Sequence, residues 1–207
     1  MEVRRVNGHS LVVLPLCVTI AWLKRGRLVY DTHELGTEAN STAGIRRWFA
    51  KRLERGLINR ADEVVVVGDE IAKWYRTTYG LSNVHIVKNV PYCQRGKLNR
   101  TSRLRDVAGV GDSDILFLYQ GLLDQGRGIN LLLNAFRDAP QDRHIVFMGY
   151  GALVESAKAF AQQYPNIHFH PAVPPEDLPE YTSSADVGLS IIENVSLSYY
   201  YCVPNKI

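Results

Sequence analysis

Residues 63–89 decide the fold, and they read EVVVVGDEIAKWYRTTYGLSNVHIVKN. A continuous apolar run opens this stretch, as expected for a parallel strand that is covered on both faces. A helical segment follows over residues 69–79 and stops at Gly80, and a short strand comes next over residues 85–89. A strand, a helix and a strand of these lengths make a βαβ unit, which predicts a parallel sheet.

The same alternation extends toward the N-terminus. Residues 27–31 are typical of a buried strand, and residues 41–60 predict a long helix with Ser41 as its N-cap. Four apolar residues of this helix share one stripe, which we expect to face the core: Ile45, Phe49, Leu53 and Leu57. Leu11 to Leu23 is too short to span a membrane and lacks a small-residue cleavage site, so it predicts a buried helix kinked at Pro15.

The alternation stops over residues 96–112, where polar residues show little periodicity, and then restarts. Further strands are expected over residues 115–120, 144–148, 167–170 and 187–192, with helices over residues 129–138 and 152–164 and from Pro175. The sequence therefore predicts an α/β protein with two doubly wound parallel-sheet domains over residues 1–95 and 113–207, joined by a linker. Few strands precede the linker, and the last strand lacks a covering helix. We therefore expect both domains to be truncated.

Composition and charge place the chain among ordinary globular proteins. Of its 207 residues 46% are hydrophobic and 22% are charged, and the three cysteines form no Cys-x-x-Cys pair. Scattered cysteines favour a reducing, cytoplasmic setting over a disulfide framework. Residues 1–100 carry a net charge of +8 and residues 101–207 one of −5. The basic half suits an anionic partner surface.

Two glycine-rich loops follow predicted strands of the second domain. The first contains Gly121 and then Gly126-Arg127-Gly128 before a helix, and the second is Gly149-Tyr150-Gly151 before another helix. Glycines let a ligand approach the backbone, and a helix N-terminus presents amide groups to an anion. The planar guanidinium of Arg127 suits phosphate. The pair of loops therefore predicts phosphate binding.

Several other site types are excluded or weak. Neither loop has the G-x-G-x-x-G spacing of a nicotinamide dinucleotide site, and no Walker-type motif or serine elbow occurs. Asp112-Ser113-Asp114 resembles a metal motif but lies at the start of a strand, away from the ligand edge. His168 and His170 share one strand face without a third ligand. No metal site is predicted.

Two features of the first domain are functional candidates. Asp31-Thr32-His33-Glu34 ends a strand, where the active sites of α/β proteins collect, so His33 is a candidate catalytic residue. The helix over residues 41–60 carries cationic side chains away from its expected apolar stripe. A solvated face and attraction to an anionic membrane both fit them: Arg46, Arg47, Lys51 and Arg55. No nucleic-acid motif accompanies this charge.

Several short motifs, taken in order, resemble a known enzyme family. They are LVYDTHEL (28–35), RADEVVVVG (60–68), NVP (89–91), YQG (119–121), GRG (126–128), FMGYG (147–151), ADVGL (185–189) and PNK (204–206). This series is similar to the large retaining glycosyltransferase family of bacteria that is called group one or family four. The resemblance covers nearly all of the chain.

The resemblance implies the GT-B fold, with two Rossmann-like domains that face each other across a cleft. It implies an acceptor on the first domain and a nucleotide-diphosphate sugar on the second, with no metal or other cofactor. His33 then lies near the reacting sugar, and Arg127 meets the diphosphate. The remaining residues implied at the donor site are Gly121, Gly149, Gly151, Glu193, Asn205 and Lys206.

The chain also departs from this family. Leu122 stands where a second basic residue often follows the glycine, and Tyr201 stands where the first glutamate of a paired-glutamate motif is expected. Glu193 is only a substitute for that glutamate. We therefore expect transfer of a sugar to a glycan or lipid-linked acceptor in cell-envelope polysaccharide biosynthesis, in the cytoplasm or on the inner face of the cell membrane. We expect the 207-residue piece itself to be inactive. A sugar-nucleotide epimerase and a non-catalytic remnant that binds a partner or a membrane are the alternatives.

Overall fold

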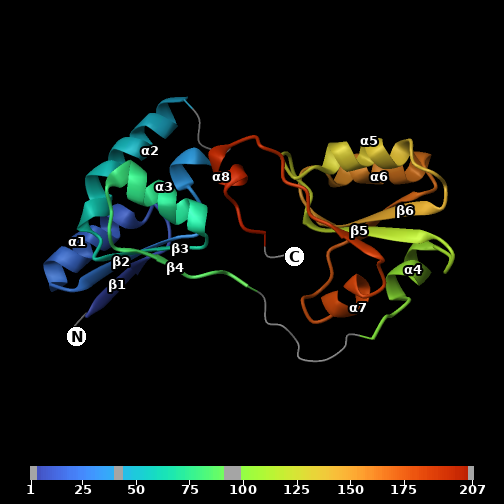
Figure 1. The fold of residues 1–207 in the computed structure, drawn as a ribbon, viewed down its shortest axis with the longest axis horizontal. Coiled ribbons are helices and arrows are strands. Elements are labelled where there is room, and N and C mark those ends of the chain that lie inside the picture. Colours follow the sequence, from blue (N-terminus) through green and yellow to red (C-terminus); the bar gives the residue numbers. More distant parts are fainter. Residues whose placement is uncertain (1–3, 40–43, 91–98, 205–207) are drawn as a thin grey trace. The chain divides into compact units, whose positions relative to one another are not determined.

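The computed structural model describes residues 4–39, 44–90 and 99–204. The chain forms two compact units (Figure 1): Met1–Pro91 with Asn194–Asn205, and Tyr92–Glu193 with Lys206–Ile207. Each unit is built on a four-stranded parallel sheet with helices between successive strands. The predicted α/β fold with two parallel-sheet domains is confirmed.

The sheet of the first unit follows the order of the chain, β1-β2-β3-β4. Its strands are β1 (Arg5–Gly8), β2 (Arg27–Thr32), β3 (Glu63–Val66) and β4 (Val84–Ile86). The connecting helices are α1 (Leu14–Lys24), α2 (Gly44–Leu57) and α3 (Asp69–Tyr79), with short 3-10 turns at Gly36–Glu38 and Ile58–Arg60. Each successive strand is added on the same side of the previous one, and connections between parallel strands are right-handed. All three helices therefore lie on one face of the sheet.

Burial in this unit follows that one-sided arrangement. Tyr30, Val64 and Val66 are fully buried, whereas Val65, on the opposite face of β3, is only half-buried. The expectation that the valine run is covered on both faces is therefore wrong for the part of the chain that is described. The alternation of side chains along each strand leaves Asp31 on the same face as Val29, away from the helices.

A buried carboxylate orients α2. Glu54 is fully buried and accepts hydrogen bonds from the hydroxyls of Tyr30 (3.2 Å), Tyr75 (3.0 Å) and Tyr79 (2.6 Å). Burial raises the pKa of Glu54, and the three hydroxyls oppose that shift. The polar side of α2 therefore faces the core.

The predicted apolar stripe of this helix consequently points the other way. Ile45, Phe49 and Leu53 are exposed, and only Leu57 is half-buried. The expectation that the stripe faces the core is wrong. The prediction followed hydrophobic periodicity alone, which cannot anticipate a carboxylate that is satisfied by three tyrosines from β2 and α3.

The N-terminal segment also differs from expectation. Pro15 lies in the first turn of α1, where its missing amide hydrogen costs nothing, so it starts the helix and does not kink it. β1 was not predicted because its four residues include only one large apolar side chain, Val6. Within the described ranges, no helix combines the length and the apolarity that crossing a bilayer requires.

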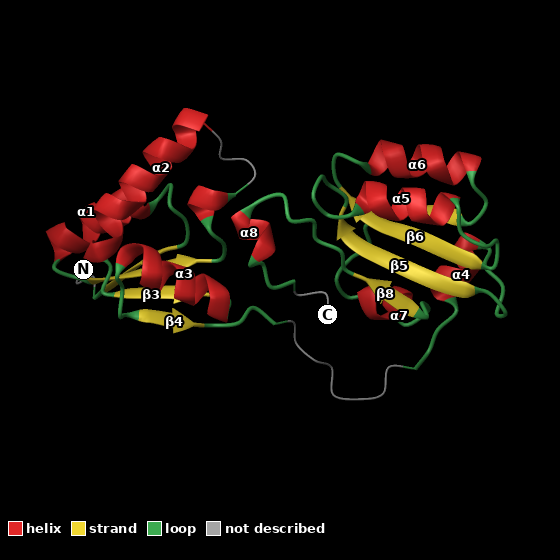
Figure 2. Cartoon of the chain, turned by 45° about the horizontal axis from the view of Figure 1, so that its top comes forward, coloured by secondary structure: helices red, strands yellow, loops and turns green. Residues whose placement is uncertain are grey.

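The second unit has the strand order β7-β6-β5-β8. Its strands are β5 (Ile115–Leu122), β6 (Arg143–Tyr150), β7 (Ile167–Pro171) and β8 (Val187–Leu189). Its helices are α4 (Arg103–Ala108), α5 (Ile129–Arg137), α6 (Val154–Gln163) and α7 (Leu178–Thr182). Figures 1 and 2 show α5 and α6 on one face of this sheet and α4 and α7 on the other.

Two apolar clusters cover the two faces of this sheet. Tyr119 and Phe147 belong to the cluster with α5 and α6, and Leu118 and Val146 belong to the cluster with α4 and α7. Adjacent residues of each central strand thus face opposite layers. The second unit is doubly wound within the described residues, as predicted.

The boundaries of the units differ from the predicted ones at two places. α4 lies inside the stretch 96–112 that was expected to be a linker, and it packs in the second unit. Residues 194–205, expected in the second domain, belong to the first unit. There α8 (Leu197–Tyr200) is capped by Ser196, and Leu197 and Tyr201 pack on the core.

Candidate functional site

The second unit contains a topological switch point at β5. The chain leaves β5 toward β6 and β7, and then returns to place β8 on the other side of β5. Open α/β sheets bind ligands outside the carboxyl ends of the strands at such a reversal. Gly121 lies near the carboxyl end of β5, Arg127 precedes α5, and Glu193 follows β8. The topology therefore brings these predicted residues to one edge of the sheet.

The glycines of the two loops allow close backbone contact. A Cβ atom on Gly149 would lie 1.8 Å from the carbonyl oxygen of Gly121, and one on Gly151 would lie 2.3 Å from that of Leu123. The amide of Leu123 donates to the carbonyl of Tyr150 at 2.7 Å. These glycines thus join the ends of β5 and β6. This packing accounts for them without a ligand, and their predicted role in the donor pocket stays a prediction.

Glu193 occupies the N-terminus of α5. The amide of Gly128, the N-cap residue with φ 71°, donates to Glu193 Oε1 at 3.0 Å, and the amide of Glu193 donates to the carbonyl of Gly126 at 2.9 Å. The Glu193 side chain is otherwise exposed, and Arg127 is half-buried directly before the helix. The carboxylate of Glu193 therefore caps the N-terminus of α5 at the switch point, and Arg127 directly precedes that helix end in the chain.

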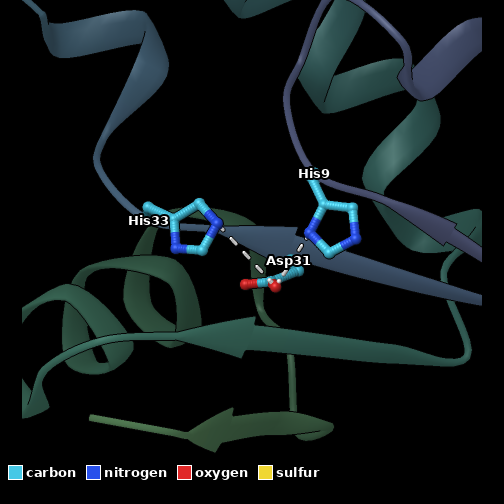
Figure 3. A group of neighbouring side chains, drawn as sticks. All are labelled: His9, Asp31 and His33. Carbon is cyan, nitrogen blue, oxygen red and sulfur yellow. Dashed lines mark hydrogen bonds and ion pairs between the residues drawn. The ribbon is translucent and has the colours of Figure 1, made fainter. Parts of the chain in front are cut away.

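In the first unit, the predicted His33 lies in a group with two residues that were not predicted (Figure 3). His9 Nδ1 is 3.0 Å from Asp31 Oδ2, and His33 Nε2 is 3.9 Å from the same oxygen. The two imidazole rings are stacked with centroids 6.2 Å apart. Asp31 is half-buried and both histidines are exposed. The group presents two nitrogen bases around one carboxylate.

Strand register explains how the three residues meet. Gly8 of β1 pairs with Tyr30 of β2, so the next residues along these parallel strands, His9 and Asp31, are neighbours. His33 lies two residues beyond Asp31. Sequence reasoning missed His9 because it missed β1, although a strand followed by a helix over residues 5–24 would have placed a histidine at this edge.

This group has two chemical capacities. Asp31 can orient an imidazole and stabilise its protonated form, as a carboxylate does beside a histidine base. One ligand atom from each of the three residues lies within 4.8 Å of the others, so the group could also hold a divalent cation. Among the described residues, this is the one cluster of three such side chains close enough to do so.

Other predicted residues are dispersed. His168 does not pair with His170: its Nε2 lies 3.0 Å from His144 Nδ1, and the rings stack. Burial lowers the pKa of His168 to about 4, and the charge of His144 adds to this shift. The predicted donor residues Asn205 and Lys206 lie outside the described residues.

The four cationic candidates of α2 differ in position. Arg46 and Arg55 are exposed, whereas Arg47 is half-buried. Lys51 Nζ lies 2.6 Å from Glu38 Oε1, in an ion pair that directs it back toward its own unit. Arg52, a fifth cationic residue of this helix, lies over the ring of Trp48, with its guanidinium carbon 5.4 Å from the ring centroid.

Comparison with solved structures shows the same architecture in glycosyltransferases of the GT-B fold. HepE of Anabaena in complex with UDP superposes with a TM-score of 0.70 at 15% identity, over 89% of this chain and 52% of that one. Sucrose-phosphate synthase of Thermosynechococcus elongatus gives 0.68 at 18% identity, over 98% and 52%. The lipopolysaccharide outer core galactosyltransferase WaaB gives 0.61 at 12% identity, over 92% and 50%.

The chain thus spans about half the length of these neighbours. No protein-family model matches the sequence, and no curated protein matches it either. At these identities the likeness establishes the fold: two Rossmann-like units of the GT-B type.

Proposed function

We propose that the chain belongs to a glycosyltransferase that moves a sugar from a nucleotide-diphosphate sugar to a glycan or lipid-linked acceptor. The observation that carries this proposal is the cap that Glu193 forms on the N-terminus of α5 at the switch point of the second sheet, directly after Arg127 in the chain. Crystals of the structural neighbour HepE contain UDP, UDP with glucose, or UDP-glucose. That neighbour makes a uridine nucleotide the first donor to test.

Each donor-site residue has a chemical role in this proposal. As the bond between the anomeric carbon and the diphosphate breaks, negative charge develops on the leaving phosphate oxygen. Arg127 stabilises that charge. One carboxylate oxygen of Glu193 accepts a hydrogen bond from the Gly128 amide. In this proposal the other oxygen accepts hydrogen bonds from hydroxyls of the nucleotide sugar. Gly121, Gly149 and Gly151 line the donor pocket in this proposal.

His33 serves the acceptor side in the same proposal. The acceptor hydroxyl loses its proton as its oxygen bonds to the anomeric carbon, and an imidazole near that oxygen assists the transfer. Asp31 and His9 orient His33 through the shared carboxylate. The proposed reaction is retaining and needs no metal, and Asn205 and Lys206 would extend the donor site.

We place this activity in cell-envelope polysaccharide biosynthesis, in the cytoplasm and peripherally on the inner face of the cell membrane. The basic first half of the chain and the exposed Arg46 and Arg55 support attraction to anionic lipid. WaaB, a lipopolysaccharide galactosyltransferase, shares the fold, which supports an envelope glycan as acceptor.

Product analysis tests the proposal. The chain, and a longer protein that contains it if one exists, is incubated with UDP-glucose labelled in the sugar and with a candidate glycan acceptor. Transfer releases free UDP and places the label in a new glycoside, whereas an epimerase returns the label in a different nucleotide sugar. Absence of nucleotide-sugar binding by calorimetry in a longer protein that contains the chain would favour a non-catalytic remnant.

A further inference from the structure

The outer face of α2 is apolar although the helix lies at the surface of its unit. Four large side chains on this face are exposed: Ile45 by 72%, Phe49 by 60%, Trp48 by 55% and Leu53 by 41%. At 100° per residue their positions fall within about 140° of the helix circumference, opposite the buried Glu54. We call these four residues the α2 apolar face. Single exposed apolar residues are common, but a continuous row along a helix marks an interaction surface.

Cationic side chains flank this face. Arg55 lies along one side and Arg46 along the other, both exposed. Arg52 lies within the face, with its guanidinium over the ring of Trp48 at 5.4 Å from the centroid. Trp48 also contacts Phe49 edge to face, with centroids 4.9 Å apart. An apolar strip with aromatic residues and arginines at its margins matches the chemistry of a bilayer interface.

The charge of α2 indicates which partner binds the α2 apolar face. Within Gly44–Leu57 the single acidic residue, Glu54, is buried against tyrosines, so the exposed charge of the helix is entirely cationic. Two copies of the face brought together about a two-fold axis would place arginines against arginines. An anionic lipid surface instead attracts every exposed charge of the helix and accepts its apolar side chains.

We infer that α2 lies in the plane of an anionic phospholipid bilayer and inserts Ile45, Trp48, Phe49 and Leu53 among the acyl chains. The inference deepens the peripheral association in the proposed function and rests on it. The proposed function invoked only electrostatic attraction of the helix to the membrane surface. The inference adds insertion of the α2 apolar face into the bilayer. The polar side of the helix, with Glu54, stays packed against the core of the first unit.

Vesicle binding of the 207-residue chain tests the inference. The chain is sedimented with phosphatidylcholine vesicles that contain either no or one-third phosphatidylglycerol. We expect binding to the anionic vesicles and at least tenfold weaker binding to the neutral ones. F49S and L53S should each weaken binding to anionic vesicles by about tenfold. L131S is the matched control, because Leu131 is 59% exposed on α5 in the other unit.

Fluorescence locates the inserted residue. A variant that retains Trp48 alone (W22F/W74F) should be quenched by brominated acyl chains, whereas a variant that retains Trp74 alone (W22F/W48F) should not be. Trp74 packs against Tyr75 and Tyr79 and serves as the internal reference. Circular dichroism checks that each variant is folded.

Several results would overturn the inference. They are no vesicle binding, equal binding of F49S, L53S and L131S, no quenching of Trp48, and a dimer that F49S disrupts in the absence of lipid. UDP-glucose calorimetry, together with vesicle binding, on a longer protein that contains the chain separates the two proposals. Vesicle binding without UDP-glucose binding would remove the transferase and keep the insertion, and the opposite pattern would do the reverse.

Discussion

Arg127 is the side chain on which the proposed donor chemistry depends most. It precedes the N-cap of α5 and offers a permanent charge where a diphosphate would leave. In a longer protein that contains this chain, we expect Arg127→Ala to lower turnover of the nucleotide sugar by roughly one to three orders of magnitude, as loss of one charge-stabilising group does. The measurement is the release of nucleoside diphosphate.

Arg137→Ala is the control for this prediction. Arg137 lies at the other end of α5, is exposed and pairs with Asp138. Its replacement should leave turnover within about twofold, since surface ion pairs contribute little. Equal rates for the two variants would show that Arg127 does not meet the leaving group.

The group His9, Asp31 and His33 predicts inhibition by zinc. Tetrahedral zinc with bonds of about 2 Å needs its ligands nearer together than 4.8 Å, but the exposed histidines can close this gap by rotating. A bound ion would occupy the imidazole lone pairs that the proposed acceptor chemistry uses. We expect micromolar Zn²⁺ to inhibit transfer by about tenfold or more, and a chelator to restore the rate.

His9→Ala tests whether zinc acts at this group. Its removal leaves two ligands, so the inhibition constant for Zn²⁺ should rise at least tenfold relative to the unaltered chain. H85A is the comparison, because His85 is an exposed histidine paired with Glu63 in the same unit. Loss of turnover when a chelator is added to protein that has received no zinc would contradict the proposed metal independence.

Residues were predictable from the sequence where chain order alone fixes their position. His33 follows a recognisable strand, and Arg127 precedes a recognisable helix, so both could be placed at the carboxyl edges of their sheets. His9 could not, because β1 carries a single large apolar residue and gives no strand pattern. The contact of Glu193 with Gly128 joins residues 65 positions apart, and no local pattern contains it.

At the scale of elements, hydrophobic periodicity located the helices better than it oriented them. α3 has the predicted bounds Asp69–Tyr79 because Gly80 adopts the left-handed conformation, φ 69°, that ends a helix. α2 was located within three residues at each end, but its core-facing side is the polar one. Periodicity reports that two sides of a helix differ, whereas the tertiary partners decide which side is buried.

The network around Glu54 predicts a large contribution to stability. Glu54→Ala removes the shared acceptor of three tyrosine hydroxyls and leaves them without it inside the core. We expect the free energy of unfolding of the first unit to fall by about 3 kcal/mol, measured by urea titration. Glu70→Ala, on the exposed side of α3, should change it by less than about 0.5 kcal/mol.

At the scale of the whole molecule, acid should destabilise the two units unequally. The pKa of His168 is about 4 in the folded second unit and about 6.5 when exposed, so the unfolded chain binds the extra proton between these values. The contribution of neutral His168 is complete above pH 6.5 and is lost as the pH falls toward 4. We expect a loss of about 2 kcal/mol, confined to the second unit.

Hydrogen exchange at pH 7.5 and pH 5 measures this difference unit by unit. Protection of β6 and β7 should fall at the lower pH, and His168→Gln should make their protection independent of pH across this range. Glu54 acts in the opposite direction, because its raised pKa favours the protonated form and therefore stabilises the first unit in acid. Equal losses of protection in both units would contradict the assignment to His168.

Over its described residues the chain passes from the first unit to the second and back again, and this has a consequence for synthesis. Leu197 and Tyr201 complete the core of the first unit, and Val203 lies against Gly68, yet all three are made after the entire second unit. At roughly 5–20 residues per second, about 100 residues of the second unit take on the order of 5–20 s to translate. During that interval the nascent first unit shows its edge at Gly68 to the ribosome surface and to chaperones. Released chains that end at residue 193 should therefore be cleaved by protease in β3 and α3 faster than the released 207-residue chain.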